Sequence, residues 1–345
     1  MIQKAISAEG LLAVPGLIDL HTHIREQGKG TETIETATEA AKAGGFAYIC
    51  MMPNTIPPID SVERLRELSW KIKKRALVSV LPIPSIAIGE SELADIEGFA
   101  KEGVFAISDD GHSIHNLSLL REACFEAKRF GLIVILHAEY NGEEPKAVEK
   151  RIELAYLTGA SIHIAHISTE EGVKLVREAK KSRINVTTEA TPHHFTLTEN
   201  DIKDGDTNFK VNPRLKSEKD REALKEGLFD GTIDIIATDH APHTRKAKEG
   251  GWENAASGMV GLETCVGLVW TELVHKGVLS ERSAIEKLTL NPAKIIGRKI
   301  GITEGEEANL VLIDPNKEWV VNPSNFKSAG RNTPFSGRRL KGKVV

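Results

Sequence analysis

Eight short β-type segments recur along the chain, and this repeat limits its fold more than any other feature. Each is rich in aliphatic or β-branched residues, with stretches of helical periodicity between them. The segments are GLIDL from residue 16, FAYICM from 46, LVSVLPI from 77, VFAIS from 104, LIVILH from 132, SIHIAH from 161, INVTTE from 184 and IDIIATD from 233. Strands that alternate with helices in this way predict an α/β fold, a (β/α)8 TIM barrel over residues 15–300.

The helical stretches between the strands carry apolar residues three or four positions apart and charges on the other face. Clear examples are residues 33–44, 61–75, 116–131 and 169–181. The seventh unit is irregular, because its strand is followed by a long polar stretch over residues 192–220. There we expect a loop and no helix.

Composition favours a small-molecule partner. The chain has 45 basic and 49 acidic residues, a net charge of -4, and no block of like charges that would mark a nucleic-acid or membrane surface. Cys50, Cys124 and Cys265 lie far apart, which argues against a disulfide framework or a thiolate zinc site. With no leader-like start and no apolar run long enough to cross a bilayer, we expect a cytoplasmic protein.

Potential metal ligands gather at the ends of the predicted strands. Residues two apart on a strand point the same way, so His21 and His23 face one direction. They could bind a metal or simply be polar residues leaving a core. Barrel enzymes build their sites at the carboxyl ends of the strands. The candidate ligands at those ends are His21, His23, Asp109, Asp110, His137, His166 and Asp239.

Nitrogen and oxygen donors without sulfur suit a catalytic zinc or a similar divalent ion. Four histidines and two aspartates, counting one of the neighbouring pair Asp109 and Asp110, exceed what one zinc needs, so we expect two ions that share a carboxylate and a hydroxide. Such a pair, about 3.5 to 4 Å apart, activates water and polarises a carbonyl group. The set therefore predicts hydrolysis of an amide or ester, or the reverse reaction.

A family resemblance adds to this interpretation. The motifs PGLIDLHTHIRE, MMPNT, SDDG, LHAE, HIAHIST, TPHHFTLT, VNPRL and ATDHAPH occur in an order that resembles the dihydroorotases of the amidohydrolase superfamily. The resemblance covers residues 14 to 300. It implies zinc-dependent, reversible hydrolysis of L-dihydroorotate to N-carbamoyl-L-aspartate in pyrimidine (UMP) biosynthesis.

The resemblance also implies a distribution of ligands. His21, His23 and Asp239 would hold the more buried zinc, and His137 and His166 the other. Many relatives bridge the ions with a carboxylated lysine, but this chain has no lysine between residues 101 and 128. It is similar instead to dihydroorotases that use an aspartate of the DDG turn. Alignment favours Asp110 as the bridge, together with hydroxide, and leaves Asp109 a supporting role.

Substrate contacts follow from the same resemblance. Dihydroorotate carries a carboxylate, which suits the forked guanidinium of Arg25. The resemblance adds Asn54, His243 and Asn212 as substrate-binding residues, and makes Asp239 the catalytic acid and base.

Three further segments carry expectations of their own. The VNPRL loop departs from the usual Asn-Pro-Pro-Leu-Arg at Arg214 and Lys216. His193 and His194 are taken as structural, because neighbours on a regular strand cannot face one site. Residues 245–258 suit a mobile loop over the pocket, or a surface loop without a role.

The chain ends and the partners complete the prediction. Relatives usually carry a small β-sandwich, whereas only 14 residues precede Pro15, so we expect residues 1–14 and 301–345 to form appended strands or a reduced sandwich. An exposed sheet edge there could be covered by another subunit, giving a homo-oligomer. Two alternatives stay open: an allantoinase or hydantoinase type of cyclic amidase, and a non-catalytic barrel that assembles with aspartate carbamoyltransferase.

Overall fold

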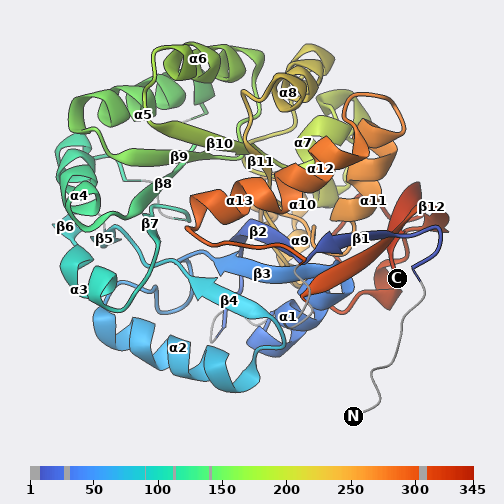
Figure 1. The fold of residues 1–345 in the computed structure, drawn as a ribbon, viewed down its shortest axis with the longest axis horizontal. Coiled ribbons are helices and arrows are strands. Elements are labelled where there is room, and N and C mark those ends of the chain that lie inside the picture. Colours follow the sequence, from blue (N-terminus) through green and yellow to red (C-terminus); the bar gives the residue numbers. More distant parts are fainter. Residues whose placement is uncertain (1–7, 27–31, 90, 112–113, 140–141, 303–308) are drawn as a thin grey trace.

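Eight strands form the barrel that the sequence predicts, and helices surround it (Figure 1). The structure is a computed structural model that describes residues 8–26, 32–89, 91–111, 114–139, 142–302 and 309–345. The barrel strands are β2 (Leu17–Thr22), β3 (Phe46–Met51), β4 (Ser79–Pro82), β7 (Ala106–Ser108), β8 (Ile133–His137), β9 (Ser161–Ala165), β10 (Val186–Ala190) and β11 (Ile235–Ile236). Each overlaps one of the eight predicted segments, so the predicted fold class is confirmed.

The strands pair in parallel, in two sheets that isolated bridges join. One sheet has the order β2-β3-β4 and the other β11-β10-β9-β8-β7. A bridge between Thr22 and His240 links β2 to the chain after β11, and one between Ser85 and Ser108 links the chain after β4 to β7. Because all eight strands run the same way, their carboxyl ends meet at one rim.

The helices of the outer layer follow the strands in sequence. They are α1 (Ile34–Ala43), α2 (Val62–Arg75), α3 (Ile96–Lys101), α4 (Leu117–Phe130), α5 (Glu144–Thr158), α6 (Glu170–Lys181), α8 (Glu218–Asp230), α11 (Cys265–Val269), α12 (Glu281–Leu288) and α13 (Leu290–Ile295). A π-helical turn, Trp270–Val274, continues α11. Side-chain caps begin several of them: the Thr33 side chain accepts from the Thr36 amide, as helix N-termini require.

Two predicted loops contain helices. Residues 192–220 include α7 (Pro192–Thr196) and two 3-10 turns, Glu199–Asp201 and Thr207–Phe209. Pro192 at the first helical turn and the Thr191 cap favour α7, and its short length hides it from periodicity. His193 and His194 therefore lie on a helix. The prediction that they are neighbours on a regular strand was wrong. Residues 245–258 likewise hold α9 (Arg245–Lys248) and α10 (Gly251–Asn254).

A three-stranded antiparallel sheet brings the two ends of the described chain together. It has the order β1-β12-β13, with β1 at Leu12–Pro15, β12 at Leu310–Val320 and β13 at Arg339–Val344. A methyl group at Gly45 would lie within 3.0 Å of side chains of β12 and β13, so this sheet packs tightly against the barrel. Residues 1–7 and 303–308 of the predicted terminal segments lie outside the described residues. A small hairpin, β5 (Ala87–Ile88) and β6 (Glu92–Leu93), lies before α3.

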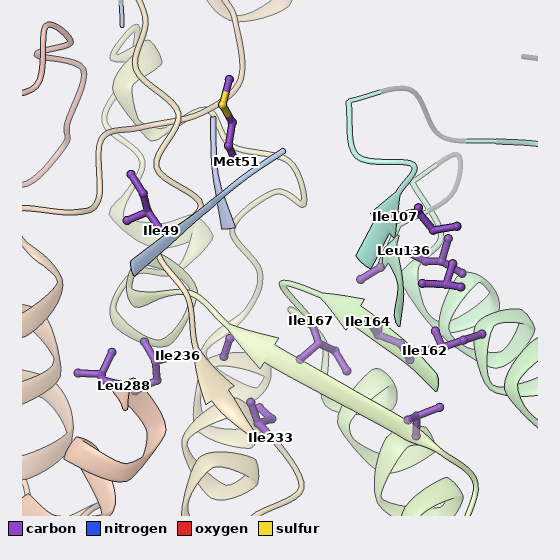
Figure 2. Packing of buried hydrophobic residues seen from close by; sticks show 14 of the residues in the cluster. Ile49, Met51, Ile107, Leu136, Ile162, Ile164, Ile167, Ile233, Ile236 and Leu288 are labelled. Carbon is purple, nitrogen blue, oxygen red and sulfur yellow. The ribbon is translucent and has the colours of Figure 1, made fainter. Parts of the chain in front are cut away.

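The apolar core has a layer between strands and helices and a layer inside the barrel. Figure 2 shows part of the outer layer, including Ile49, Met51, Ile162 and Ile164. The intervening strand residues, such as Cys50, join a separate inner cluster. This alternation is the strand period of two. It leaves the rim as the place where polar side chains from different strands meet.

Candidate active site

Five buried side chains at the rim form two overlapping groups of donor atoms. One group is His21, His23 and Asp239, and the other is His21, Asp110 and His166. Within each group the donor atoms lie within 4.8 Å of one another. The side chains come from the ends of β2, β7, β9 and β11, as the sequence predicts for ligands of a barrel enzyme.

His21 belongs to both groups, and short contacts between imidazoles and carboxylates connect them further. The Nε2 atom of His21 lies 3.1 Å from Asp110 Oδ2 and 3.7 Å from Asp239 Oδ1. The Nε2 atom of His23 lies 3.0 Å from Asp239 Oδ1 and 3.7 Å from Asp110 Oδ1. Two carboxylates and two imidazoles thus converge on one small volume, an arrangement that suits cation binding.

Unsatisfied nitrogen atoms test whether these residues fit a metal. His21 Nε2 and His166 Nδ1 are buried and make no hydrogen bond to the described residues. Buried polar atoms normally find a partner, and an ion can supply it. The nitrogen and oxygen donors also match the preferences of zinc. The residues present therefore fit a divalent cation.

Backbone strain coincides with the same residues. His166 has φ of 29° and Asp239 has φ of 47°, in the left-handed region that non-glycine residues seldom occupy. Only one further non-glycine residue of the described chain, Arg183, has a positive φ. Such strain persists only where the surrounding structure enforces it and concentrates at functional sites.

Hydrogen bonds orient the two histidines of the HTH motif. His21 Nδ1 lies 2.7 Å from Glu189 Oε1, and His23 Nδ1 lies 2.9 Å from Asn54 Oδ1. Because a carboxylate and an amide oxygen accept hydrogen bonds, each Nδ1 carries a proton, and Nε2 is the ring atom that faces the donor cluster. Both rings are therefore prepared to act as ligands through Nε2.

Glu189 is a functional residue that the sequence reasoning missed. It is buried one residue before the end of β10. Its carboxylate also lies 3.1 Å from His163 Nε2 and accepts from the His166 amide. A glutamate within a buried strand was the available signal, since an ionised carboxylate is seldom buried without partners.

His137 and the two aspartates of the DDG turn have distinct surroundings. The His137 ring centroid is 4.3 Å from that of His166, although His137 belongs to neither donor group. Asp109 accepts from the His137 amide at 3.0 Å, while Asp110 faces His21. Of the two, Asp110 is therefore the one directed at the donor cluster.

The four predicted substrate residues lie around this cluster. Arg25 Nη1 donates to the Pro242 carbonyl at 3.0 Å, and His243 Nε2 donates to the Ser257 carbonyl at 2.8 Å. Asn212 Nδ2 lies 3.4 Å from His137 Nε2. Asn54 orients His23, a contact that the sequence did not reveal.

Comparison with known proteins decides the family. A sequence profile described as the amidohydrolase family matches residues 12–345. The chain belongs to the amidohydrolase family. A dihydroorotase of Pelotomaculum thermopropionicum is 45% identical over 367 residues, covering 98% of this chain and 86% of that protein. A dihydroorotase of Bacillus cytotoxicus is 41% identical, with the same coverage.

Solved structures agree on the fold of this amidohydrolase. An L-hydantoinase from Arthrobacter aurescens superposes with a TM-score of 0.89 at 25% identity, covering 98% of this chain and 84% of that one. A dihydropyrimidinase from Brevibacillus agri gives a TM-score of 0.89 at 22% identity, covering 99% and 84%. The amidohydrolase is accordingly a hydrolase with a TIM-barrel fold. None of its helices in the described ranges combines the length and apolar character needed to span a membrane.

Burial and neighbouring charges shift the pKa values of the residues in the amidohydrolase site. Burial alone would lower the pKa of His21, but the Asp110 and Glu189 carboxylates raise it well above its usual value. Burial lowers the pKa of His166 far below normal, so that ring is neutral. Burial would raise the pKa of Asp110, yet nearby histidines hold it well below its usual value. The site thus presents anionic carboxylates, and a cation would replace the proton on His21.

The side of the site that is predicted to bind the substrate carboxylate is more exposed than the buried donor cluster. Burial lowers the pKa of Arg25, while the charges of Asp239 and Asp110 oppose that change. Burial and the neighbouring Arg25 charge lower the pKa of His243 to about 3, so its imidazole is neutral. A cavity of about 660 Å³ opens beside His243, between α9 and the chain around Arg331.

Proposed function

We propose that this amidohydrolase is a dihydroorotase that reversibly hydrolyses L-dihydroorotate to N-carbamoyl-L-aspartate. The observation that carries the proposal is a guanidinium, Arg25, beside a cluster of metal-capable donors in a chain 39–45% identical to proteins named dihydroorotase. The donors account for hydrolysis, and the cation accounts for a ring substrate that carries a carboxylate.

Two zinc ions are the proposed cofactors. His21, His23, Asp110, His137, His166 and Asp239 would hold them, with Asp110 shared in place of a carboxylated lysine. The absence of lysine from residues 102–127 supports this choice. When bound, such ions lower the pKa of water and polarise the scissile carbonyl.

Asp239 is the proposed proton carrier. Burial would raise its pKa, but the hydrogen bond from His23 and the charge of His21 hold it well below the usual value. It is therefore ionised and able to accept the proton of the attacking water. It would then deliver that proton to the departing ring nitrogen, acting first as base and then as acid.

Arg25, Asn54, His243 and Asn212 are the proposed substrate-binding residues. Arg25 supplies charge for the carboxylate. The Nδ2 group of Asn54 stays available to a ligand while its oxygen accepts from His23. Neutral His243 donates through Nε2 to Ser257, so contact with a carboxylate requires a proton at Nδ1 or a turned ring.

A hydantoinase or allantoinase activity is the main competing function, since the structural neighbours include hydantoinases. Arg25 and Asn54 oppose it, because those substrates lack the ring carboxylate. Steady-state assays of purified protein with dihydroorotate, hydantoin and allantoin distinguish the activities. A clear preference for hydantoin or allantoin would overturn the proposal.

Assembly and location are further parts of the proposal. We infer a cytoplasmic enzyme, open to self-association through the β1-β12-β13 sheet or to a complex with aspartate carbamoyltransferase. Repeating the assay with added transferase, with the mass of the complex measured by light scattering, tests both. Activity that appears only with the transferase would mean that catalysis needs the partner, whereas no activity in either state would favour the non-catalytic alternative.

A further inference from the structure

Asn332, in the chain between β12 and β13, contacts three backbone groups near the active site. Its Nδ2 donates to the carbonyls of Ala241 and Gly258, each at 3.0 Å, and its Oδ1 accepts from the His243 amide at 2.9 Å. The side chain is 5% exposed. An amide has two N–H donors, so both donors and the acceptor are used.

The segment that carries Asn332 is itself firmly held. Ser328 Oγ and the Ala329 amide donate to the buried Glu32 carboxylate at 2.6 and 3.1 Å. The Val260 amide donates to the Asn332 carbonyl at 3.0 Å. On either side of Asn332, Phe326 and Phe335 pack in one apolar cluster with residues of the loops around the rim. Asn332 is therefore a fixed point against which those loops are placed.

The groups that Asn332 contacts belong to the carboxylate-binding side. Ala241 and His243 flank Pro242, whose carbonyl accepts from Arg25. Gly258 follows Ser257, whose carbonyl accepts from His243. Arg25 and His243 are thus both attached to backbone that Asn332 holds.

The metal-capable side has separate support. The His23 amide donates to the His240 carbonyl at 2.9 Å, and the His240 amide donates to the His21 carbonyl at 3.3 Å. These bonds fix the chain next to Asp239 without Asn332. Removing the Asn332 side chain should therefore disturb substrate binding more than metal binding.

We propose that Asn332 is a positioning residue that sets Arg25 and His243 for the substrate carboxylate from outside the barrel. This inference rests on the proposed function, because it assigns the carboxylate of dihydroorotate to that side. According to this inference, the chain after β12 helps to shape the active site. If Asn332 had only a structural role, its loss would instead lower the stability of the fold and leave the kinetic constants unchanged.

The test compares Asn332→Ala with Asn325→Ala, a change at an exposed asparagine of the same segment. We expect the KM for dihydroorotate to rise about tenfold or more in Asn332→Ala, the effect of losing buried hydrogen bonds, while kcat changes by less than about threefold. Bound zinc should stay at the wild-type level, and Asn325→Ala should match wild type.

A second variant approaches the same contact from the other side. A methyl group at Gly330 would lie 2.6 Å from Pro242 Cβ, so Gly330→Ala should push the two segments apart and raise KM in the same way. It decides the question if Asn332→Ala does not fold. An unchanged KM in a folded variant of either kind, or loss of zinc with unchanged KM, would overturn the inference.

Hydrogen exchange separates this inference from the proposed function. In Asn332→Ala, peptides spanning residues 241–243 and 257–260 should exchange faster than in wild type, whatever the substrate. A wild-type protein without activity on dihydroorotate would refute the proposed function. Unchanged exchange in those peptides would refute the positioning role even if the wild type is active.

Discussion

The Glu189 carboxylate lies 2.7 Å from His21 Nδ1, on the side of the ring away from Asp110. Burial would raise the pKa of Glu189, but His21 and His163 hold it well below its usual value, so the carboxylate is ionised. An anion at this position fixes the tautomer of His21 and makes its Nε2 a better donor to a metal.

Glu189→Gln should therefore weaken zinc binding. The amide keeps the shape but loses the negative charge and cannot accept from His21 and His163 at once. We expect about a 10- to 100-fold loss of zinc affinity, measured by competition with a chelator. Glu178→Gln, at an exposed glutamate on α6, is the matched control. Equal affinities of Glu189→Gln and wild type would contradict this role.

Asp110 and Asp109 should differ in their effect on metal content. Asp110 lies 3.1 Å from His21 Nε2, whereas Asp109 holds the His137 backbone amide. Elemental analysis should find about two zinc ions per wild-type chain. Asp110→Ala should empty at least one site, and Asp109→Asn should retain more metal. The reverse order would make Asp109 the bridge, and full activity without metal would end the metal hypothesis.

Reconstitution should be independent of bicarbonate. A carboxylated lysine requires carbon dioxide or bicarbonate to form, but this chain has no lysine between residues 101 and 128, the region that includes the end of β7. Metal-free protein given zinc in carbonate-depleted buffer should regain the same activity as protein given zinc with bicarbonate. A clear stimulation by bicarbonate would indicate a carbamate bridge.

Arg25→Met should raise the KM for dihydroorotate and leave the metals bound. A charge-assisted contact contributes roughly 1.5 to 3 kcal/mol, and the carboxylate takes no part in bond breaking, so the loss should fall mainly on KM. Arg25→Lys should restore part of the affinity, because it keeps the charge but not the fork. Normal kinetics in Arg25→Met would favour the hydantoinase alternative.

Lys248 should make stability depend on pH. Its buried ammonium donates to the carbonyls of Lys210, Ala256 and Gly258, and burial lowers its pKa from 10.5 to about 8. As pH rises from about 8 to 10.5, the folded protein loses a proton that the unfolded chain still holds, so the free energy of unfolding gains up to about 3 kcal/mol from this group.

Thermal unfolding at about pH 7 and about pH 10 checks this effect. Lys248→Met cannot gain stability in this way, so its deficit relative to wild type should be larger at the higher pH. Lys246→Met, at an exposed lysine of the same helix, should follow wild type at both values. A deficit that is constant or shrinks as pH rises would contradict the lowered pKa.

The barrel could be predicted from sequence because its signals are local. Each strand is a short apolar run and each long helix repeats every three or four residues, so both can be recognised without knowing what they contact. The short helix α7 was not predicted, since five residues are too few to show a helical period. The rule that barrel sites lie at carboxyl strand ends then located His21, His23, Asp110, His166 and Asp239.

Tertiary structure alone decided how these side chains meet. Sequence could not reveal that His21 belongs to both donor groups or that Glu189 orients its ring. Nor could it reveal that Asn332 contacts His243, 89 residues away along the chain. Such contacts depend on how the barrel closes and on the path of the chain after β12. Residues far apart in sequence leave no periodic signal of their contact, because only the packing of the whole chain sets the distance between them.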